Sequence, residues 1–151
     1  MHEISSQRQP AGEQKVSSEV DALRPRVLVV DDDPESRDAL GALLAQAGLK
    51  VELADSVREA IRALDMHSPN ALVSDLVMPV EDGFSLIHTI RERESGSRER
   101  LPAIAVTAIA DPSIRRHAVA AGFDACFLKP FAGRAVVNAV AQAVRQSPRP
   151  R

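Results

Sequence analysis

The hydrophobic pattern divides most of the chain into alternating short and longer segments. Five short apolar runs bounded by turn residues predict strands, at residues 26–31, 50–54, 71–75, 103–107 and 125–128. Three of the runs contain the sequences VLVV, ALVS and AIAV and are apolar almost throughout. Continuous apolar runs of this length are typical of parallel strands that are covered on both faces.

Longer segments with apolar residues spaced three and four positions apart follow the strands and predict helices. They cover residues 34–47, 57–67, 83–94, 112–121 and 133–145. Asp33 is expected to cap the first helix, and Ser56 and Glu59 form a capping box at the second. The alternation (βα)5 predicts an α/β domain, a doubly wound five-stranded parallel sheet with helices on both faces.

Polar sequence flanks this pattern at both ends. Residues 1–25 are mixed in charge and rich in Ser, Gln and Glu, so we expect a flexible leader or linker with a helical turn near residues 16–23. Residues 147–151, at the end of the sequence RQSPRPR, predict a disordered basic tail. The folded domain is therefore expected to span residues 26–146.

Composition narrows the class of protein. The 151 residues are 44% hydrophobic and 26% charged with a formal net charge of −2, which fits one globular domain and disfavours a nucleic-acid binder. Cys126 is the single cysteine and cannot form an internal disulfide, so we expect a reducing, cytoplasmic location. No apolar run resembles a signal-peptide core or a membrane span, so we expect no membrane association.

Acidic and polar residues stand where the predicted strands end. The first strand ends in Asp31 and Asp32, Asp75 ends the third, Thr107 ends the fourth and Lys129 follows the fifth. In a flavodoxin-like sheet of order 2-1-3-4-5, these ends meet at the crevice where ligands bind. Each residue alone has an ordinary structural explanation, such as a helix cap or a loop acid. Agreement among four strand ends favours a functional site.

Carboxylates gathered in one crevice repel one another unless a proton or a cation relieves them. Hard oxygen ligands suit Mg²⁺, which usually keeps several waters and bridges to a phosphate. A carboxylate beside Mg²⁺ can attack a phosphoryl group and form an acyl phosphate, while Lys129 and the Thr107 hydroxyl can contact phosphoryl oxygens. The sequence contains no P-loop, GxGxxG motif or Ser/His/Asp arrangement, so nucleotide binding is unsupported.

At this point the sequence resembles a bacterial response-regulator receiver domain, the chemotaxis-regulator-like phospho-acceptor of two-component signalling. The resemblance covers about residues 26–146 and rests on VLVVDDDP, VSDLVMPVEDG, VTA at 106–108 and FLKPF at 127–131. It implies that Asp75 is phosphorylated and that Asp32 binds Mg²⁺ directly. It also implies that Asp31 binds Mg²⁺ through water and that the Val77 carbonyl is a further ligand.

The same resemblance implies a switch role for Thr107, phosphate binding by Lys129 and a cis Lys129–Pro130 bond. Gly83 is expected to let the chain turn tightly into the third helix. The output residues that the resemblance implies lie on the fourth helix, the fifth strand and the start of the fifth helix: Ile114, Arg115, Val119, Cys126, Ala132 and Val136.

The chain departs from the family pattern at the position of Cys126. Receivers usually carry an aromatic residue three positions before the lysine, where this chain has Cys126, and Phe127 should point to the opposite face of the sheet. The usual coupling of the threonine to a swinging ring is therefore in question. Val77 and Ile109 are apolar and should hinder an attacking water, which predicts a long-lived phospho-state.

The implied partner is a sensor histidine kinase or a histidine phosphotransfer protein, and the downstream target is not indicated. No effector domain follows Arg145, so we expect no direct DNA binding. We expect the protein to be a monomer or a weak dimer. Three accounts stay open: a stand-alone receiver, a phosphorelay intermediate, and the terminal receiver of a hybrid histidine kinase.

Two functions from other classes compete with this interpretation. Aspartate-nucleophile phosphatases need a second acid two residues after the nucleophile, whereas Asp75 is followed by Leu76 and Val77. We therefore expect no enzyme beyond catalysis of its own phosphorylation and dephosphorylation. A purely structural interaction module is the other alternative, and it predicts no binding of a beryllofluoride–Mg²⁺ phosphate mimic.

Overall fold

A computed structural model describes residues 23–129 and 133–146. Its strands are β1 (Arg26–Val30), β2 (Lys50–Ala54), β3 (Ala71–Asp75), β4 (Ala103–Thr107) and β5 (Ala125–Leu128). Its helices are α2 (Pro34–Gln46), α3 (Val57–His67), α4 (Gly83–Arg93), α5 (Pro112–Ala121) and α6 (Gly133–Gln146). The predicted leader up to residue 22, the Lys129–Pro130 bond, Ala132 and the tail 147–151 lie outside the described residues.

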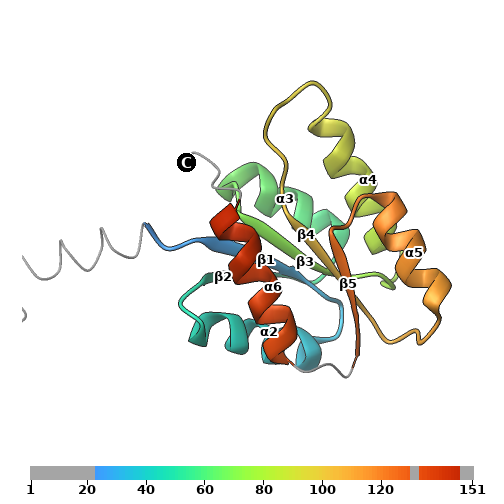
Figure 1. Cartoon of the computed structure of the whole chain (residues 1–151), viewed down its shortest axis with the longest axis horizontal. Coiled ribbons are helices and arrows are strands. Elements are labelled where there is room, and N and C mark those ends of the chain that lie inside the picture. The colour runs from blue at the N-terminus through green and yellow to red at the C-terminus, as the bar shows by residue number, and fades with distance from the viewer. Residues whose placement is uncertain (1–22, 130–132, 147–151) are drawn as a thin grey trace, which may run out of the picture.

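The five strands are parallel and lie in the order β2-β1-β3-β4-β5, as predicted. Helices α2 and α6 cover one face of the sheet, and α3, α4 and α5 cover the other (Figure 1). The chain therefore reverses direction along the sheet between β1 and β3, which opens a crevice at the carboxyl ends of these strands.

The alternation of side chains along β1 explains why a continuous apolar run is needed there. Val27 and Val29 belong to the cluster beneath α2 and α6, whereas Leu28 and Val30 belong to the cluster beneath α3, α4 and α5. All four side chains are at most 1% exposed. Both faces of the strand are thus packed, as the sequence VLVV predicts.

Short polar side chains begin the helices directly after the strands. The Asp33 carboxylate accepts the Ser36 N–H at the start of α2, and the Ser56 hydroxyl accepts the Glu59 N–H at the start of α3. Both predicted caps are therefore confirmed. Helices α2 and α4 end one residue before their predicted ends, where the cap residue follows, and α6 ends one residue after its predicted end.

Gly83 begins α4, but the reason for a glycine differs from the tight turn that we expected. Its N–H donates to the Leu76 carbonyl at 3.0 Å, so the helix start lies directly against the chain that leaves β3. A Cβ at this position would collide with the carbonyl oxygen of Asp75 and would lie 3.0 Å from the Cα of Leu76. Close packing of the backbone therefore requires the glycine.

Candidate functional site

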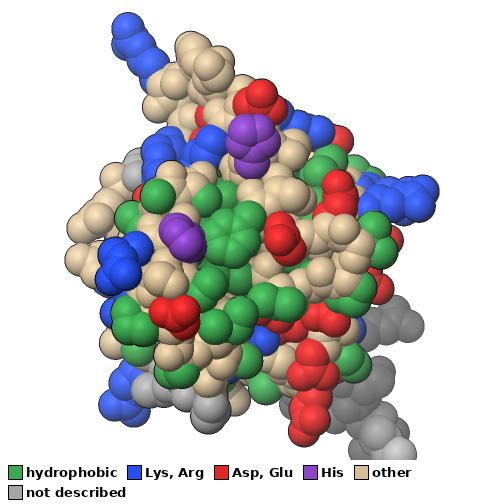
Figure 2. Space-filling view, turned by 90° about the vertical axis from the view of Figure 1, so that its right-hand side faces the viewer, with side chains coloured by type: hydrophobic (Ala, Val, Ile, Leu, Met, Phe, Trp, Pro, Cys, Tyr) green, Lys and Arg blue, Asp and Glu red, His purple; other side chains and the backbone are tan. Residues whose placement is uncertain are grey.

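Three carboxylates meet at the carboxyl edge of the sheet. One oxygen from each of Asp31, Asp32 and Asp75 lies within 4.8 Å of the other two. Asp31 is 1% exposed and Asp75 is 8% exposed, whereas Asp32 is open to solvent. Figure 2 shows acidic side chains around a basic one in the lower part of the face it presents, with hydrophobic side chains directly above.

Lys129 follows the edge strand β5 and brings a positive charge into this acidic crevice. Its Nζ lies 2.6 Å from Oδ2 of Asp31 and 3.3 Å from Oδ2 of Asp75. The backbone N–H of Lys129 donates to the Thr107 carbonyl at 2.7 Å, which continues the pairing of β4 and β5 past Leu128. The sheet itself therefore aims the ammonium group at the carboxylates.

Burial and charge act in opposite directions on the titration of this cluster. Burial raises the pKa of the Asp75 carboxyl, and the charge of Asp31 raises it further, while Lys129 and the Val77 N–H oppose the rise. Burial alone would lower the pKa of Lys129, but its contacts with Asp31 and Asp75 outweigh burial and raise the pKa. The lysine is consequently held in its charged form.

Backbone donors fix the two buried carboxylates. The Asp33 N–H donates to Oδ1 of Asp31 at 3.0 Å, and the Val77 N–H donates to Oδ1 of Asp75 at 3.3 Å. Each carboxylate thus has one oxygen held by the loop that follows its strand and the other near Lys129. The arrangement leaves Oδ2 of Asp75 oriented by a cation and not by the backbone.

Thr107 ends β4 and is only 3% exposed. Its hydroxyl oxygen accepts the Ile109 N–H at 3.2 Å, which holds the oxygen at the start of the loop before α5. Asp75 and Val106 are paired across β3 and β4, so Thr107 lies one residue further along the same edge. The predicted phosphoryl-contacting residues are therefore brought to neighbouring strand ends.

Apolar side chains form part of the rim of the crevice. Val77 is 56% exposed in the loop after β3, and Ile109 is 42% exposed in the loop after β4. Val80, in the same loop as Val77, is fully exposed and has a φ of 70°, which is strained for a β-branched residue. The backbone N–H groups of Val77 and Ile109 donate to the side chains of Asp75 and Thr107, so both residues lie next to the crevice. Hindrance of an attacking water by their side chains stays a prediction.

The predicted output residues that the structure describes differ in exposure. Val119 is exposed and Ile114 is half-buried, whereas Arg115 donates to the Cys126 carbonyl at 3.0 Å. Cys126 is 6% exposed, and Val136 of α6 is completely buried against the sheet, so neither side chain offers much area to a partner. The contact of Arg115 with β5 was not indicated by the sequence, because no local motif links these two elements.

Phe127 and Cys126 lie on opposite faces of the sheet, as their alternation predicts. Cys126 packs in the cluster beneath α3, α4 and α5, and Phe127 packs against the cluster beneath α2 and α6. Burial raises the pKa of the Cys126 thiol, and the charge of Arg115 only partly opposes this effect. The thiol is therefore protonated and packs as a small apolar side chain in the core.

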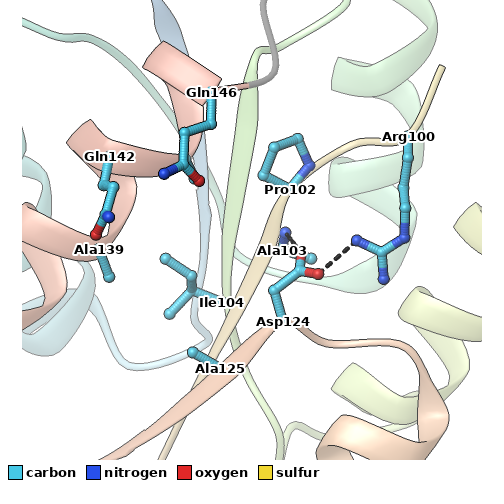
Figure 3. Close-up of a pocket in the computed structure, with 10 residues that line it drawn as sticks. Arg100, Pro102, Ala103, Ile104, Asp124, Ala125, Ala139, Gln142 and Gln146 are labelled. Carbon is cyan, nitrogen blue, oxygen red and sulfur yellow. Dashed lines mark hydrogen bonds and ion pairs between the residues drawn. The ribbon is translucent and has the colours of Figure 1, made fainter.

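Among the hollows that lie outside the acidic cluster, two border β4 and β5. One, of about 250 Å³, lies beside Thr107 and Cys126. The other, of about 380 Å³, lies at the amino ends of β4 and β5. Figure 3 shows Gln142 and Gln146 on one side of this second hollow and the bonded pair Arg100 and Asp124 on the other. It contains none of the strand-end residues that form the acidic crevice.

Among residues 23–129 and 133–146, no helix combines the length and hydrophobicity that a membrane span requires.

The sequence of the domain matches one family along most of its length. Residues 27–141 match the response regulator receiver domain. The chain is 42% identical over 116 residues to an uncharacterised 14.6 kDa protein of Leptolyngbya boryana, covering 77% of this chain and 87% of that protein. It is 35% identical over 106 residues to the response regulator Rre1 of a Synechocystis strain, covering 70% of this chain and 45% of that relative. The chain thus spans less than half of Rre1.

Solved structures show the same architecture. A putative response regulator from Chloroflexus aurantiacus superposes with a TM-score of 0.74 at 30% identity, over 81% of this chain and 98% of that one. The chemotaxis protein CheY4 of Vibrio cholerae superposes with a TM-score of 0.70 at 26% identity, over 80% of this chain and 98% of that one.

Proposed function

Because the chain belongs to the response-regulator receiver family of two-component signalling, we propose that Asp75 accepts a phosphoryl group from a phosphohistidine. The observation that carries this proposal is the convergence of Asp31, Asp32, Asp75 and Lys129 in one crevice. An oxygen of Asp75 attacks phosphorus, the P–N bond breaks, and the imidazole leaves with the electron pair. The product is an acyl phosphate on the protein.

The donor set of the crevice fits Mg²⁺. It offers carboxylate oxygens within 4.8 Å of one another, and hard oxygen ligands are those that Mg²⁺ prefers. Asp32 would hold the ion directly and Asp31 through water, with Asp75 and the Val77 carbonyl as the other ligands. When bound, the ion neutralises charge on the phosphoryl oxygens as they approach the carboxylates.

Lys129 and Thr107 act on the transferred group from the other side. The ammonium group of Lys129 exchanges its contact with Asp75 for one with a phosphoryl oxygen, which disperses the added negative charge. The Thr107 hydroxyl donates to a second phosphoryl oxygen while its own oxygen keeps the Ile109 N–H. The Lys129 N–H donates to the Thr107 carbonyl, so the two residues are linked where β4 and β5 end. A phosphoryl group that contacts both side chains therefore acts on both strand ends together.

The phosphorylated domain then alters its contacts with other proteins. Its direct partners are a sensor histidine kinase or a histidine phosphotransfer protein, and residues 26–146 constitute the receiver. A stand-alone regulator, a phosphorelay intermediate and the receiver of a hybrid kinase all use this chemistry. The chain itself catalyses only its own phosphorylation and dephosphorylation.

The test is incorporation of phosphoryl from phosphoramidate with Mg²⁺, followed by mass spectrometry. Wild-type protein gains one phosphoryl group, and Asp75→Asn gains none. Asp33→Asn is the matched control, because Asp33 belongs to the same acidic run but caps α2 and should remain a substrate. Incorporation by Asp75→Asn at the wild-type rate would overturn the proposal.

A further inference from the structure

A hollow of about 240 Å³ lies at the amino edge of the sheet, at the opposite ends of the strands from the acidic crevice. It is bordered by the starts of β1 and β2, by the end of α3 and by the residue before β3. The residues that line it are Arg24, Arg26, Lys50, Met66, His67, Ser68 and Asn70. Among the residues that the structure describes, none that lines this basic hollow is acidic.

The pairing of β1 with β2 brings two of the cations together. Arg26 and Lys50 are partners in the parallel register, so their side chains point to the same face of the sheet. This is the face that α3 covers, because Leu28, two residues after Arg26, packs in the cluster beneath that helix. Both basic side chains are half-buried, and like charges in a poorly hydrated place repel one another. An anion in the basic hollow would relieve this repulsion.

Neutral acceptors position the two guanidinium groups of the basic hollow. Arg24 donates to the carbonyls of Gly48 at 3.0 Å and Leu49 at 3.2 Å. Arg26 donates to the carbonyl of His67, at the end of α3, at 2.9 Å. A carbonyl accepts a hydrogen bond without carrying a negative charge, so these bonds fix the two groups in place and do not neutralise them.

Glu52 contacts the same group of side chains. Its Oε1 lies 3.4 Å from Nε of Arg26 and 3.5 Å from Nδ1 of His67. The contact with Arg26 is an ion pair and not a hydrogen bond, since the buried Nε has no acceptor among the residues that the structure describes. One carboxylate shared by two partners offsets at most one positive charge, so the hollow keeps its basic character.

Asn70 adds oriented amide donors to the basic hollow. It is 7% exposed, and its Oδ1 accepts the Arg26 N–H at 2.9 Å. Its own backbone N–H donates to the Arg26 carbonyl at 2.7 Å, which holds the residue in place. Because the oxygen of the amide is committed to the backbone, the NH₂ group is the part that can face the hollow. Donors beside cations suit a ligand with several negatively charged oxygens.

We propose that the basic hollow binds a small phosphate monoester. Arginine and lysine are preferred partners of phosphate oxygens, and a guanidinium group can contact two of them at once. The hollow is larger than the roughly 150 Å³ cavity that holds a benzene ring, so it has room for a phosphate group with a small organic substituent. Met66 is 69% exposed and offers an apolar surface to that substituent.

A small anion suits this site better than a nucleic acid does. The cations converge on one hollow, whereas nucleic-acid binding requires basic side chains spread along a surface. The formal net charge of the chain, −2, also disfavours a polyanion. The inference is independent of the proposed function, because no residue of the acidic crevice lines the basic hollow.

The test uses phenyl phosphate, its uncharged analogue phenol, and the methyl NMR signals of Met66 and Met78. Met66 lines the basic hollow, whereas Met78 lies in the loop after Asp75 and reports on the acidic crevice. Without Mg²⁺, phenyl phosphate should shift the Met66 signal to saturation and leave that of Met78 unchanged, because the acidic crevice repels an anion. It should bind at least about tenfold more tightly than phenol, which cannot form the charge-assisted bonds.

Two variants remove the proposed contacts and one control keeps them. Asn70→Asp retains an oxygen for the Arg26 N–H but replaces the amide donor with a negative charge, so it should abolish binding of phenyl phosphate. Lys50→Gln removes one positive charge and should weaken binding by at least about fivefold. It keeps the test valid if Asn70→Asp fails to fold. Arg62→Gln removes the same charge from an exposed position of α3 outside the hollow and should bind as wild type does.

Equal affinities for phenol and phenyl phosphate would overturn the inference, as would undiminished binding in both Asn70→Asp and Lys50→Gln. A shift of Met78 without a shift of Met66 would place the anion in the acidic crevice and refute the new site. A response of Met66 to a short DNA duplex, with none to phenyl phosphate, would replace the small ligand with a polyanion.

Discussion

The ammonium nitrogen of Lys129 lies 2.6 Å from a carboxylate oxygen of Asp31, although 98 positions separate the two residues in the sequence. Asp31 is almost completely buried, so its charge needs a partner inside the protein. Lys129 provides that partner and also contacts Asp75. The lysine therefore partly neutralises the site before any metal or phosphoryl group arrives.

Lys129→Met should destabilise the metal-free protein. The change leaves two buried carboxylates without their cation, and we expect a loss of roughly 2–3 kcal/mol, somewhat below the cost at a fully buried pair. Mg²⁺ should restore more stability to this variant than it adds to wild type, because it supplies the missing positive charge. Urea unfolding with and without Mg²⁺ measures both effects.

Lys50→Met is the control for that experiment, because Lys50 lies at the amino edge of the same sheet. Its gain in stability from Mg²⁺ should equal that of wild type. An equal gain in Lys129→Met would contradict the view that the lysine and the metal neutralise the same carboxylates.

Asp75→Asn should stabilise the metal-free protein at neutral pH, with a difference that shrinks in acid. Burial first, and then the charge of Asp31, raise the pKa of Asp75 above 3.8, so its ionised form weakens the folded state. This penalty is fully present above the raised pKa, falls as the pH drops through it, and is gone below 3.8. Urea unfolding from pH 7 to pH 3.5 compares the two proteins. A constant difference over this range would contradict the assignment.

The alternation of strands and helices could be predicted because each strand is covered on both faces. Val29 and Val30 pack on opposite sides of β1, so a continuous apolar run in the sequence corresponds to burial on both faces of the strand. The opposite orientations of Cys126 and Phe127 follow from the same rule. The acidic site could be predicted in outline, because parallel strands end at one edge and Asp31, Asp75 and Lys129 stand at such ends.

What the sequence did not reveal are contacts between elements distant in the chain. The guanidinium group of Arg91 donates to the Gly122 carbonyl, 31 residues away, and no periodicity indicates that partner. The requirement for Gly83 likewise depends on how closely α4 approaches β3. The hollow beside Cys126 depends on where α5 begins. Each of these features is a property of packing and not of local sequence.

Gly83→Ala should both destabilise the fold and slow phosphorylation. The added Cβ collides with the Asp75 carbonyl, so either α4 or the backbone of the phosphorylated residue must move. Overpacking of this kind costs about 1–3 kcal/mol. Thermal unfolding and the rate of labelling by phosphoramidate measure the two effects.

Gly96→Ala provides the comparison for Gly83→Ala. Its Cβ meets nothing within 4 Å, but the φ of 83° strains any residue other than glycine. It should lose stability without any change in the rate of labelling. A normal rate in Gly83→Ala would show that the position of α4 does not affect Asp75.

Arg91→Met should destabilise the protein without affecting phosphorylation. Arg91 donates to the carbonyls of Gly122 and Leu101 and pairs with Glu94, and its side chain is 18% exposed. Loss of these charge-assisted bonds should cost about 2–3 kcal/mol. Arg93→Met removes a more exposed pair with Asp65 and should cost less than about 1 kcal/mol. Equal losses of unfolding free energy in the two variants, measured with urea, would contradict the view that the contacts of Arg91 stabilise the fold.

Val77→Asn should shorten the lifetime of the phosphorylated state. The Val77 N–H donates to Asp75, and Val77 is 56% exposed in the loop that follows the strand. Beside an acyl phosphate on Asp75, an apolar side chain would exclude water, whereas an amide would orient it. We expect dephosphorylation to accelerate by about tenfold, which is less than the roughly 10²–10⁴-fold of a general base, because an amide can orient the water but cannot take its proton. Val80→Asn is the matched control, since it makes the same change three residues along the loop, at a fully exposed side chain with a positive φ that asparagine tolerates. Decay of the phosphorylated species is followed after removal of phosphoramidate. Equal lifetimes in wild type and Val77→Asn would show that Val77 does not control the access of water. Faster dephosphorylation in Val80→Asn as well would assign the effect to the loop as a whole.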